Sequence, residues 1–181
     1  MIPETLSIVE RQILANQFKI LSKITDQTEE YEIKIEILEN GYTEQYYEIF
    51  EVDTEEIPVE ICEETSQILN MYRRINNALD TLSEEEKEGL DLEKIKFEGF
   101  DAHNDTHYYY MNFMVKRMNL WREYKSEYLN SHSPLSLLKY RKMLEYQNYL
   151  LDNDQYDLNK EDINCMIELL NSSKKIISVA V

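Results

Sequence analysis

The sequence predicts an all-α fold, a single compact domain of about six to seven helices. Three observations point to this class. The 181 residues include only three glycines and three prolines, so few residues interrupt a helix. Hydrophobic residues make up 43% of the chain, enough for one domain of this length to bury a core. Several segments repeat apolar residues at helical spacing, and no linker or internal repeat marks a second domain, so we expect one domain over residues 1–181.

The first predicted helix covers about residues 8–24. Ser7 and Glu10 have the S-x-x-E spacing of a capping box, in which each side chain accepts a hydrogen bond from the backbone of the other residue. Apolar residues recur near helical spacing along this segment: Leu6, Val9, Ile13, Phe18 and Leu21. The spacing predicts a helix with an apolar face.

The next segment, residues 28–40, has two interpretations. Alternating apolar residues fit a strand (Tyr31, Ile33, Ile35, Ile37), and a second set fits a helix (Tyr31, Ile35, Leu38). Gly41 favours the helix, because a glycine just past a Glu-rich run is typical of a helix C-terminus. A shorter helix is expected to follow over residues 43–51.

The longest predicted helix covers about residues 58–82, with Pro58 in its first turn. Beyond this proline, residues recur alternately four and three positions apart: Ile61, Thr65, Ile68, Tyr72, Ile75, Leu79 and Leu82. This spacing is a heptad seam. Spacing alone leaves open whether the seam packs within the chain or against a second copy.

The central part of the chain is expected to contain a loop, an extended stretch and a buried helix. The polar, acidic segment 83–91 predicts the loop, and residues 95–100 predict the extended stretch. Asp101 is placed to cap a helix that reaches about residue 129. Because residues 108–115 are apolar on nearly every side, this helix is expected to be buried in the core or in an oligomer interface.

Two further helices are predicted toward the C-terminus. Ser133 and Pro134 fit the N-cap and first position of one helix. Asn159 and Asp162, three residues apart, fit the start of the last helix. The tail, residues 172–181, has β-branched residues and no acid, so it is either frayed or docked as a short extended piece.

Charge and composition exclude several functional classes. The formal net charge of −17 argues against direct nucleic-acid binding, which needs clustered Lys and Arg, and it is compatible with a basic protein partner. We find neither a basic segment before an apolar N-terminal core nor a membrane-length apolar run, so we expect a cytoplasmic protein with no membrane segment. Cys62 and Cys165 are far apart and are expected to be reduced thiols.

A metal site is the sharpest chemical alternative. His103 and His107 stand at i and i+4, so both imidazoles could reach one ion, with Asp105 or Asp101 adding a carboxylate. Zinc sites need three or four ligands, and the remaining histidine, His132, is distant in sequence. Polar residues before a helix also serve as caps without any metal. We therefore predict no metal and no cofactor, and we keep these residues as the alternative site.

No catalytic residue is predicted. Ser131 precedes His132, but adjacency in sequence does not place a hydroxyl within hydrogen-bond reach of an imidazole. Neither serine nor cysteine lies in a GxSxG elbow, and no glycine-rich loop could hold a phosphate.

Five phrases together resemble the YfbU family of bacterial proteins, in order and at matching separations over about residues 5–150. They are TLSIVERQILANQFKIL at 5–21, ILENGYTEQYYEIF at 37–50, ILNMYRRI at 68–75, FEGFD at 97–101 and NSHSPLSLLKYRKML at 130–144. The family is all-helical and has no established activity, so the resemblance implies a fold rather than a reaction.

The resemblance also names candidate functional residues. Polar positions that match the family phrases are Arg11, Asn16, Gln17, Asp101, Asn130, His132 and Arg141. His103 and His107 match no family histidine. Some relatives carry a DNA-binding ribbon-helix-helix arm before a similar domain. Few residues precede Thr5 here, so we expect that arm and its DNA binding to be absent.

These observations predict a non-enzymatic protein-interaction or regulatory module. We expect it to self-associate, most simply as a homodimer through the apolar helix after residue 106. The alternative is a metal- or ligand-binding sensor or hydrolase built on Asp101, His103, His107 and His132.

Overall fold

The computed structural model describes residues 3–52 and 55–171, and within these ranges the chain forms helices and no strand. The all-α prediction is therefore confirmed. The chain divides into two compact units, Met1–Glu56 and Ile57–Val181, and a separate apolar cluster forms the core of each. The expectation of one domain over residues 1–181 stays a prediction. None of the described helices combines the length and the apolar character needed to cross a membrane.

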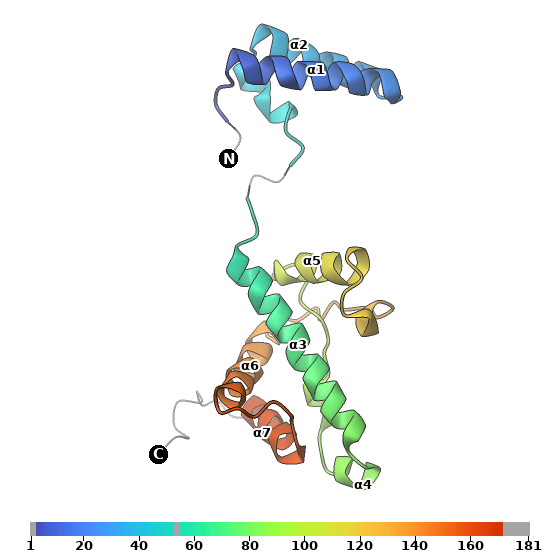
Figure 1. Ribbon diagram of the computed structural model, residues 1–181, viewed down its shortest axis with the longest axis vertical. Coiled ribbons are helices and arrows are strands. Elements are labelled where there is room, and N and C mark those ends of the chain that lie inside the picture. The colour runs from blue at the N-terminus through green and yellow to red at the C-terminus, as the bar shows by residue number, and fades with distance from the viewer. Residues whose placement is uncertain (1–2, 53–54, 172–181) are drawn as a thin grey trace. The chain divides into compact units, whose positions relative to one another are not determined.

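The first unit is a helical hairpin followed by a 3₁₀ turn (Figure 1), and its elements are α1 (Ile8–Ile24), α2 (Thr28–Asn40) and η1 (Thr43–Glu48). The capping box is confirmed, since the amide of Glu10 donates to Ser7 Oγ over 3.2 Å and the amide of Ser7 donates to Glu10 Oε2 over 2.8 Å. Gly41 ends α2 at a φ of +71°, as its sequence position predicted. The third predicted helix is a 3₁₀ helix.

The core of this unit uses only part of the apolar set that the spacing along α1 suggested, because Leu6 and Phe18 pack in it and Val9 and Ile13 do not. Leu14, Ala15 and Phe18 pack with the core residues Ile37, Leu38, Tyr46 and Ile49. Val9 and Ile13, by contrast, are 66% and 52% exposed. Position 18 lies four residues after position 14 and three after position 15, so the three share one side of the helix, and that side faces α2. Helix α1 thus has two apolar faces.

The second unit is built around the long helix α3, with α5 and α6 packed against it and α7 packed on α6 (Figure 1). Its elements are α3 (Val59–Thr81), α4 (Glu84–Lys87), η2 (Leu92–Ile95), α5 (His107–Asn112), the π-helical η3 (Phe113–Arg117), η4 (Arg122–Tyr124), α6 (Ser136–Asp152) and α7 (Lys160–Asn171).

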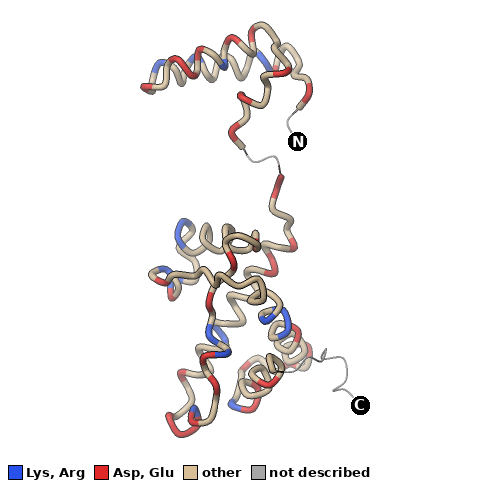
Figure 2. The backbone as a smooth tube through the Cα atoms, turned by 180° about the vertical axis from the view of Figure 1, so that it is seen from behind, with Lys and Arg blue, Asp and Glu red and all other residues tan. Residues whose placement is uncertain are grey.

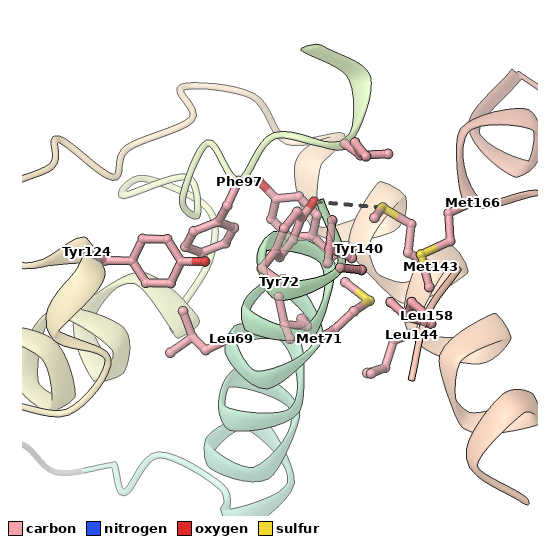
Figure 3. Close-up of a cluster of buried hydrophobic side chains, with 14 of the residues drawn as sticks. Leu69, Met71, Tyr72, Phe97, Tyr124, Tyr140, Met143, Leu144, Leu158 and Met166 are labelled. Atoms are coloured by element: carbon pink, nitrogen blue, oxygen red, sulfur yellow. Dashed lines mark hydrogen bonds between the residues drawn. The ribbon is translucent and has the colours of Figure 1, made fainter. Parts of the chain in front are cut away.

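The heptad seam of α3 supplies the centre of the second core. Its middle positions, Thr65, Ile68, Tyr72 and Ile75, are fully buried within the unit. The Tyr72 ring packs on Phe97 and Tyr140 with centroid distances of 4.8 and 5.2 Å, and its hydroxyl donates to the sulfur of Met143 over 3.7 Å (Figure 3). The seam therefore packs within the chain.

The helix expected to reach residue 129 is much shorter. It begins at His107 with Thr106 as N-cap, so Asp101 does not cap it. After α5 the backbone widens into the π turn η3, and Asn119 and Trp121 then adopt positive φ values of +59° and +43°. Those left-handed residues end the helical path, because a right-handed helix needs negative φ throughout.

Of three other helix boundaries, two differ from the predictions and one matches. The expected loop 83–91 contains the short helix α4, and a second capping box, formed by Ser83 and Glu86, lies at its start. Helix α6 begins at Ser136, two residues after Pro134, because Ser133 closes a preceding turn by accepting the Ser136 amide. The last helix starts as predicted, with Asn159 and Asp162 exchanging hydrogen bonds of 3.0 Å. The tail 172–181 lies outside the described residues.

Candidate functional site

The candidate residues of the first unit lie on α1 and have different environments. Arg11 Nη1 donates a hydrogen bond to the carbonyl oxygen of Leu38, 3.1 Å away in the last turn of α2. A cation at that position complements the negative end of the helix dipole, so Arg11 fastens α1 to α2. Asn16 and Gln17 are exposed, and Asn16 Oδ1 accepts a hydrogen bond from Gln12 Nε2 over 2.9 Å.

In the second unit, Phe100 and Asn130 form an isolated parallel bridge. Gly99 brings the two segments together at a φ of +86°, and a Cβ at this position would lie 1.9 Å from the carbonyl oxygen of Leu129. Only glycine fits so close to a backbone. Tyr140 of α6 donates its hydroxyl to the Gly99 carbonyl over 2.8 Å and so holds the same point from the other side of the core.

Asp101 organises the turn that follows this bridge. Its carboxylate accepts from the His103 amide over 2.9 Å and from Asn104 Nδ2 over 2.8 Å, while its own amide donates to Asp105 Oδ2 over 3.0 Å. The hydrogen bond from the His103 amide is the main reason that the pKa of Asp101 is lowered. Asp101 therefore stabilises the turn 101–105 rather than the start of α5.

Asn130 connects the two segments through its side chain. Its Oδ1 accepts from the amides of Ala102 and His132, both over 3.2 Å. His132 has a left-handed φ of +49°, and its Nε2 lies 3.1 Å from the hydroxyl of Tyr128. The imidazole of His132 thus pairs with a neighbour in its own loop.

Glu64 joins three helices of the second unit. From α3, its Oε2 lies 2.8 Å from Nε2 of His107 on α5. Arg141 on α6 donates to the same carboxylate through Nε, 2.7 Å from Oε1, and through Nη2, 2.8 Å from Oε2. This two-pronged contact is the strongest geometry for an arginine and a carboxylate.

The electrostatics of Glu64 follow from that contact. Hydrogen bonds from Arg141 lower the pKa of Glu64, and burial, which favours the neutral acid, opposes them only in part. The same contact raises the pKa of Arg141. A carboxylate with both oxygens engaged by a cation is a poor proton acceptor, so this cluster is suited to holding helices together rather than to acid–base catalysis.

His107 is the most enclosed of the three histidines. Its side chain is 4% exposed, and its ring stacks on Phe100 with a centroid distance of 5.3 Å. Its Nδ1 is buried and has no hydrogen-bond partner among the described residues. His107 therefore contributes one polar contact, to Glu64, and one ring contact to the core.

The alternative metal ligands do not converge. His103 is exposed, His107 faces Glu64, His132 faces Tyr128, and Asp105 accepts the amide of Asp101. Across residues 3–52 and 55–171, no three His, Cys, Asp or Glu side chains lie close enough together to hold one ion. Cys62 and Cys165 are free and half-buried.

A shallow hollow on the second unit contains one of the candidate residues. Asn130 lines it, together with residues from two loops: Glu93, Lys96, Phe97, Glu98, Glu127, Tyr128 and Ser131. Glu64, His107 and Arg141 lie outside it. The hollow thus does not bring the polar cluster into contact with a bound molecule.

Glu64 is the central residue that sequence reasoning missed. Its partners are 43 and 77 residues away along the chain, beyond the reach of any local spacing rule. One signal was present, because Glu64 directly precedes the seam position Thr65 and a carboxylate at the edge of a core needs a partner. Along the described part of the chain, Figure 2 shows acidic residues in both units and Lys and Arg at scattered points.

Comparison with known proteins relates this chain to a family and to a curated relative. The family model of the YfbU domain matches residues 5–168. The UPF0304 protein MJECS11 of Methanocaldococcus jannaschii is 35% identical over 173 residues, which cover 92% of this chain and 99% of that protein. Since that organism is an archaeon, such proteins are not confined to bacteria.

Proposed function

Because the chain belongs to the YfbU family, we propose that it works as a non-enzymatic interaction or regulatory module that self-associates. The proposal places it in the cytoplasm, without direct contact to nucleic acid, since a net charge of −17 repels a polyanion. Its first partner is a second copy of the same chain.

The observation that carries the proposal is the outer face of α1. Val9, Ile13, Ile20 and Ile24 are 52–72% exposed along one side of this helix, although its opposite side already supplies the core of the first unit. A row of branched apolar side chains of this kind is costly to leave in water, and rows like it mark interaction surfaces.

The interface first expected after residue 106 has weaker support. That expectation assumed one continuous apolar helix, whereas α5 ends at Asn112 and the chain leaves the helical path after η3. Exposed apolar side chains remain in this segment, including Tyr109 and Phe113, but α1 offers the longer row of them on one helix.

The metal- or ligand-binding alternative also has less support than the interaction module. Asp101 and Asn130 are engaged with backbone amides, and Arg141 and His107 are engaged with Glu64. Their hydrogen bonds maintain the fold, and a ligand would have to displace them.

Light scattering of the full chain, purified without a histidine tag, tests the proposal. At tens of micromolar we expect a mass of twice 21.8 kDa. A mass of 21.8 kDa would overturn self-association. Metal analysis of the same sample tests the alternative, and about one zinc or manganese ion per chain would favour it over the interaction module.

A further inference from the structure

We propose that α1 pairs with α1 of a second copy in an antiparallel, two-fold symmetric contact centred between Asn16 and Gln17. This inference rests on the proposed self-association and adds the surface, the orientation and the register.

The first observation is the position of the apolar row on α1. Val9, Ile13, Ile20 and Ile24 are 66%, 52%, 62% and 72% exposed. Steps of four, seven and four residues keep the four side chains on one side of a helix with 3.6 residues per turn. Leu14, Ala15 and Phe18, on the other side, belong to the core of the first unit. The row is thus a second face of α1 that the first unit leaves exposed.

The second observation is that the apolar residues of this face are spaced equally on both sides of a midpoint between Asn16 and Gln17. Ile13 lies three residues before Asn16, and Ile20 lies three residues after Gln17. At seven residues in each direction stand Val9 and Ile24. In a two-fold symmetric contact, if residue i of one copy meets residue j of the other, then residue j of the first copy also meets residue i of the second. A helix whose apolar residues are spaced equally on both sides of a midpoint therefore pairs apolar with apolar residues when a second copy runs antiparallel to it. Val9 then meets Ile24 of the second copy, and Ile13 meets its Ile20.

Charge selects the antiparallel orientation. Glu10 lies six residues before Asn16, and Lys23 lies six residues after Gln17, so antiparallel pairing places each carboxylate at the level of a partner's ammonium group. Parallel pairing would place Glu10 beside its own copy and Lys23 beside its own copy, which is repulsive. The hydrogen bond from the Ser7 side chain lowers the pKa of Glu10, so its carboxylate is ionised at neutral pH. The occupant that complements this face is therefore a second copy.

The centre of the face is polar in a way that fixes the register. Asn16 and Gln17 are exposed, and each amide carries both donors and an acceptor. Across a two-fold axis an amide meets its own copy, with which it can exchange hydrogen bonds. A single polar level inside an apolar helix pair disfavours shifted registers, because a shift would leave the amides against isoleucine.

Disulfide trapping tests the orientation. In a Cys62→Ala, Cys165→Ala background, Asn16→Cys lies next to the axis and is expected to give a covalent dimer on oxidation. Val9→Cys alone is not expected to give a covalent dimer, because the two cysteines at position 9 would be about 22 Å apart along the helix axis. A disulfide needs Cα atoms within about 7 Å. A mixture of Val9→Cys and Ile24→Cys chains is expected to cross-link. Cross-linking of Val9→Cys with itself, and none in the mixture, would overturn the antiparallel arrangement.

Matched variants test the location. Ile20→Glu is expected to raise the dimer dissociation constant by at least about 100-fold, since it buries two charges. Ile33→Glu on α2 is the control, because Ile33 is 57% exposed, close to the 62% of Ile20, and lies outside the row. Lys23→Glu is expected to weaken the dimer about threefold. Adding Glu10→Gln, which keeps the capping box, is expected to restore it.

The outcomes separate this inference from the proposed function. A parent chain that dimerises while Ile20→Glu dimerises equally well uses another surface, so the α1 contact is wrong and self-association stands. A parent chain that stays monomeric at tens of micromolar overturns both. Circular dichroism of each variant confirms that the helical content is retained.

Discussion

Gly99 is the residue on which the pairing of Phe100 with Asn130 depends most directly. It combines a left-handed φ with a backbone contact in which a Cβ would overlap the carbonyl of Leu129. We predict that Gly99→Ala lowers the free energy of unfolding by at least about 3 kcal/mol, of which the left-handed φ accounts for about 1–2 kcal/mol. Urea unfolding measures the loss.

Gly89 provides the control for that measurement. It has a φ of +91°, close to that of Gly99, but a Cβ there would meet no atom within 4 Å. Gly89→Ala therefore isolates the backbone strain, and a cost of about 1–2 kcal/mol is expected. Equal losses for the two variants would mean that the Leu129 contact contributes nothing.

Glu64 gives a prediction about acid stability. Because the contact with Arg141 lowers its pKa in the folded chain, Glu64 stabilises the fold above the unfolded value of 4.5, and this contribution disappears as the pH falls through the folded value. Arg141 is 48% exposed, so solvent screens the pair, and Glu64→Gln is expected to cost about 1 kcal/mol at neutral pH.

The difference between the parent and Glu64→Gln should shrink as the pH drops below 4.5, and urea unfolding at several pH values would detect this. Glu84→Gln is the control, since Glu84 is 91% exposed in its pair with Lys87 and its loss should matter little at any pH. A difference for Glu64→Gln that persists unchanged into acid would show that the charge of Glu64 is not its stabilising feature.

Among the elements, those with a local start and stop signal were predictable from the sequence. Helix α1 begins where the capping box placed its start, and α2 ends where Gly41 placed its end. Helix α5 was not predictable to its end, because the π turn and the left-handed residues after it are set by packing rather than by local propensity. The packed face of α1 was predicted only in part: Leu6 and Phe18 pack in the core, whereas Val9 and Ile13 lie on a second, exposed apolar face.

The candidate site was likewise predictable only in part. Arg11, Asp101, Asn130 and Arg141 were named from the sequence, and each makes a specific contact in the structure. Glu64 was missed, because its hydrogen-bond partners lie on α5 and α6, which only the tertiary fold brings to α3. A spacing rule covers one or two helical turns and cannot include such partners.

For the whole molecule, the two separate cores predict how the chain unfolds. Leu38→Ala in the first core and Ile75→Ala in the second should each cost about 2–5 kcal/mol, because both side chains are fully buried. If the units unfold independently, calorimetry will show two transitions, and each variant will lower only one of them. A single transition that both variants lower equally would instead support the one-domain prediction.

The contact between Arg11 and Gly41 bears on how this sequence can drift over evolutionary time. A Cβ at position 41 would lie 2.6 Å from Arg11 Nη1, the atom that donates to the Leu38 carbonyl. Loss of the guanidinium group at position 11 would remove this contact but not the strain of a φ of +71°. Glycine should therefore persist at position 41 in lineages with or without the arginine, 30 residues away, and an alanine there would in addition displace the guanidinium group from the Leu38 carbonyl.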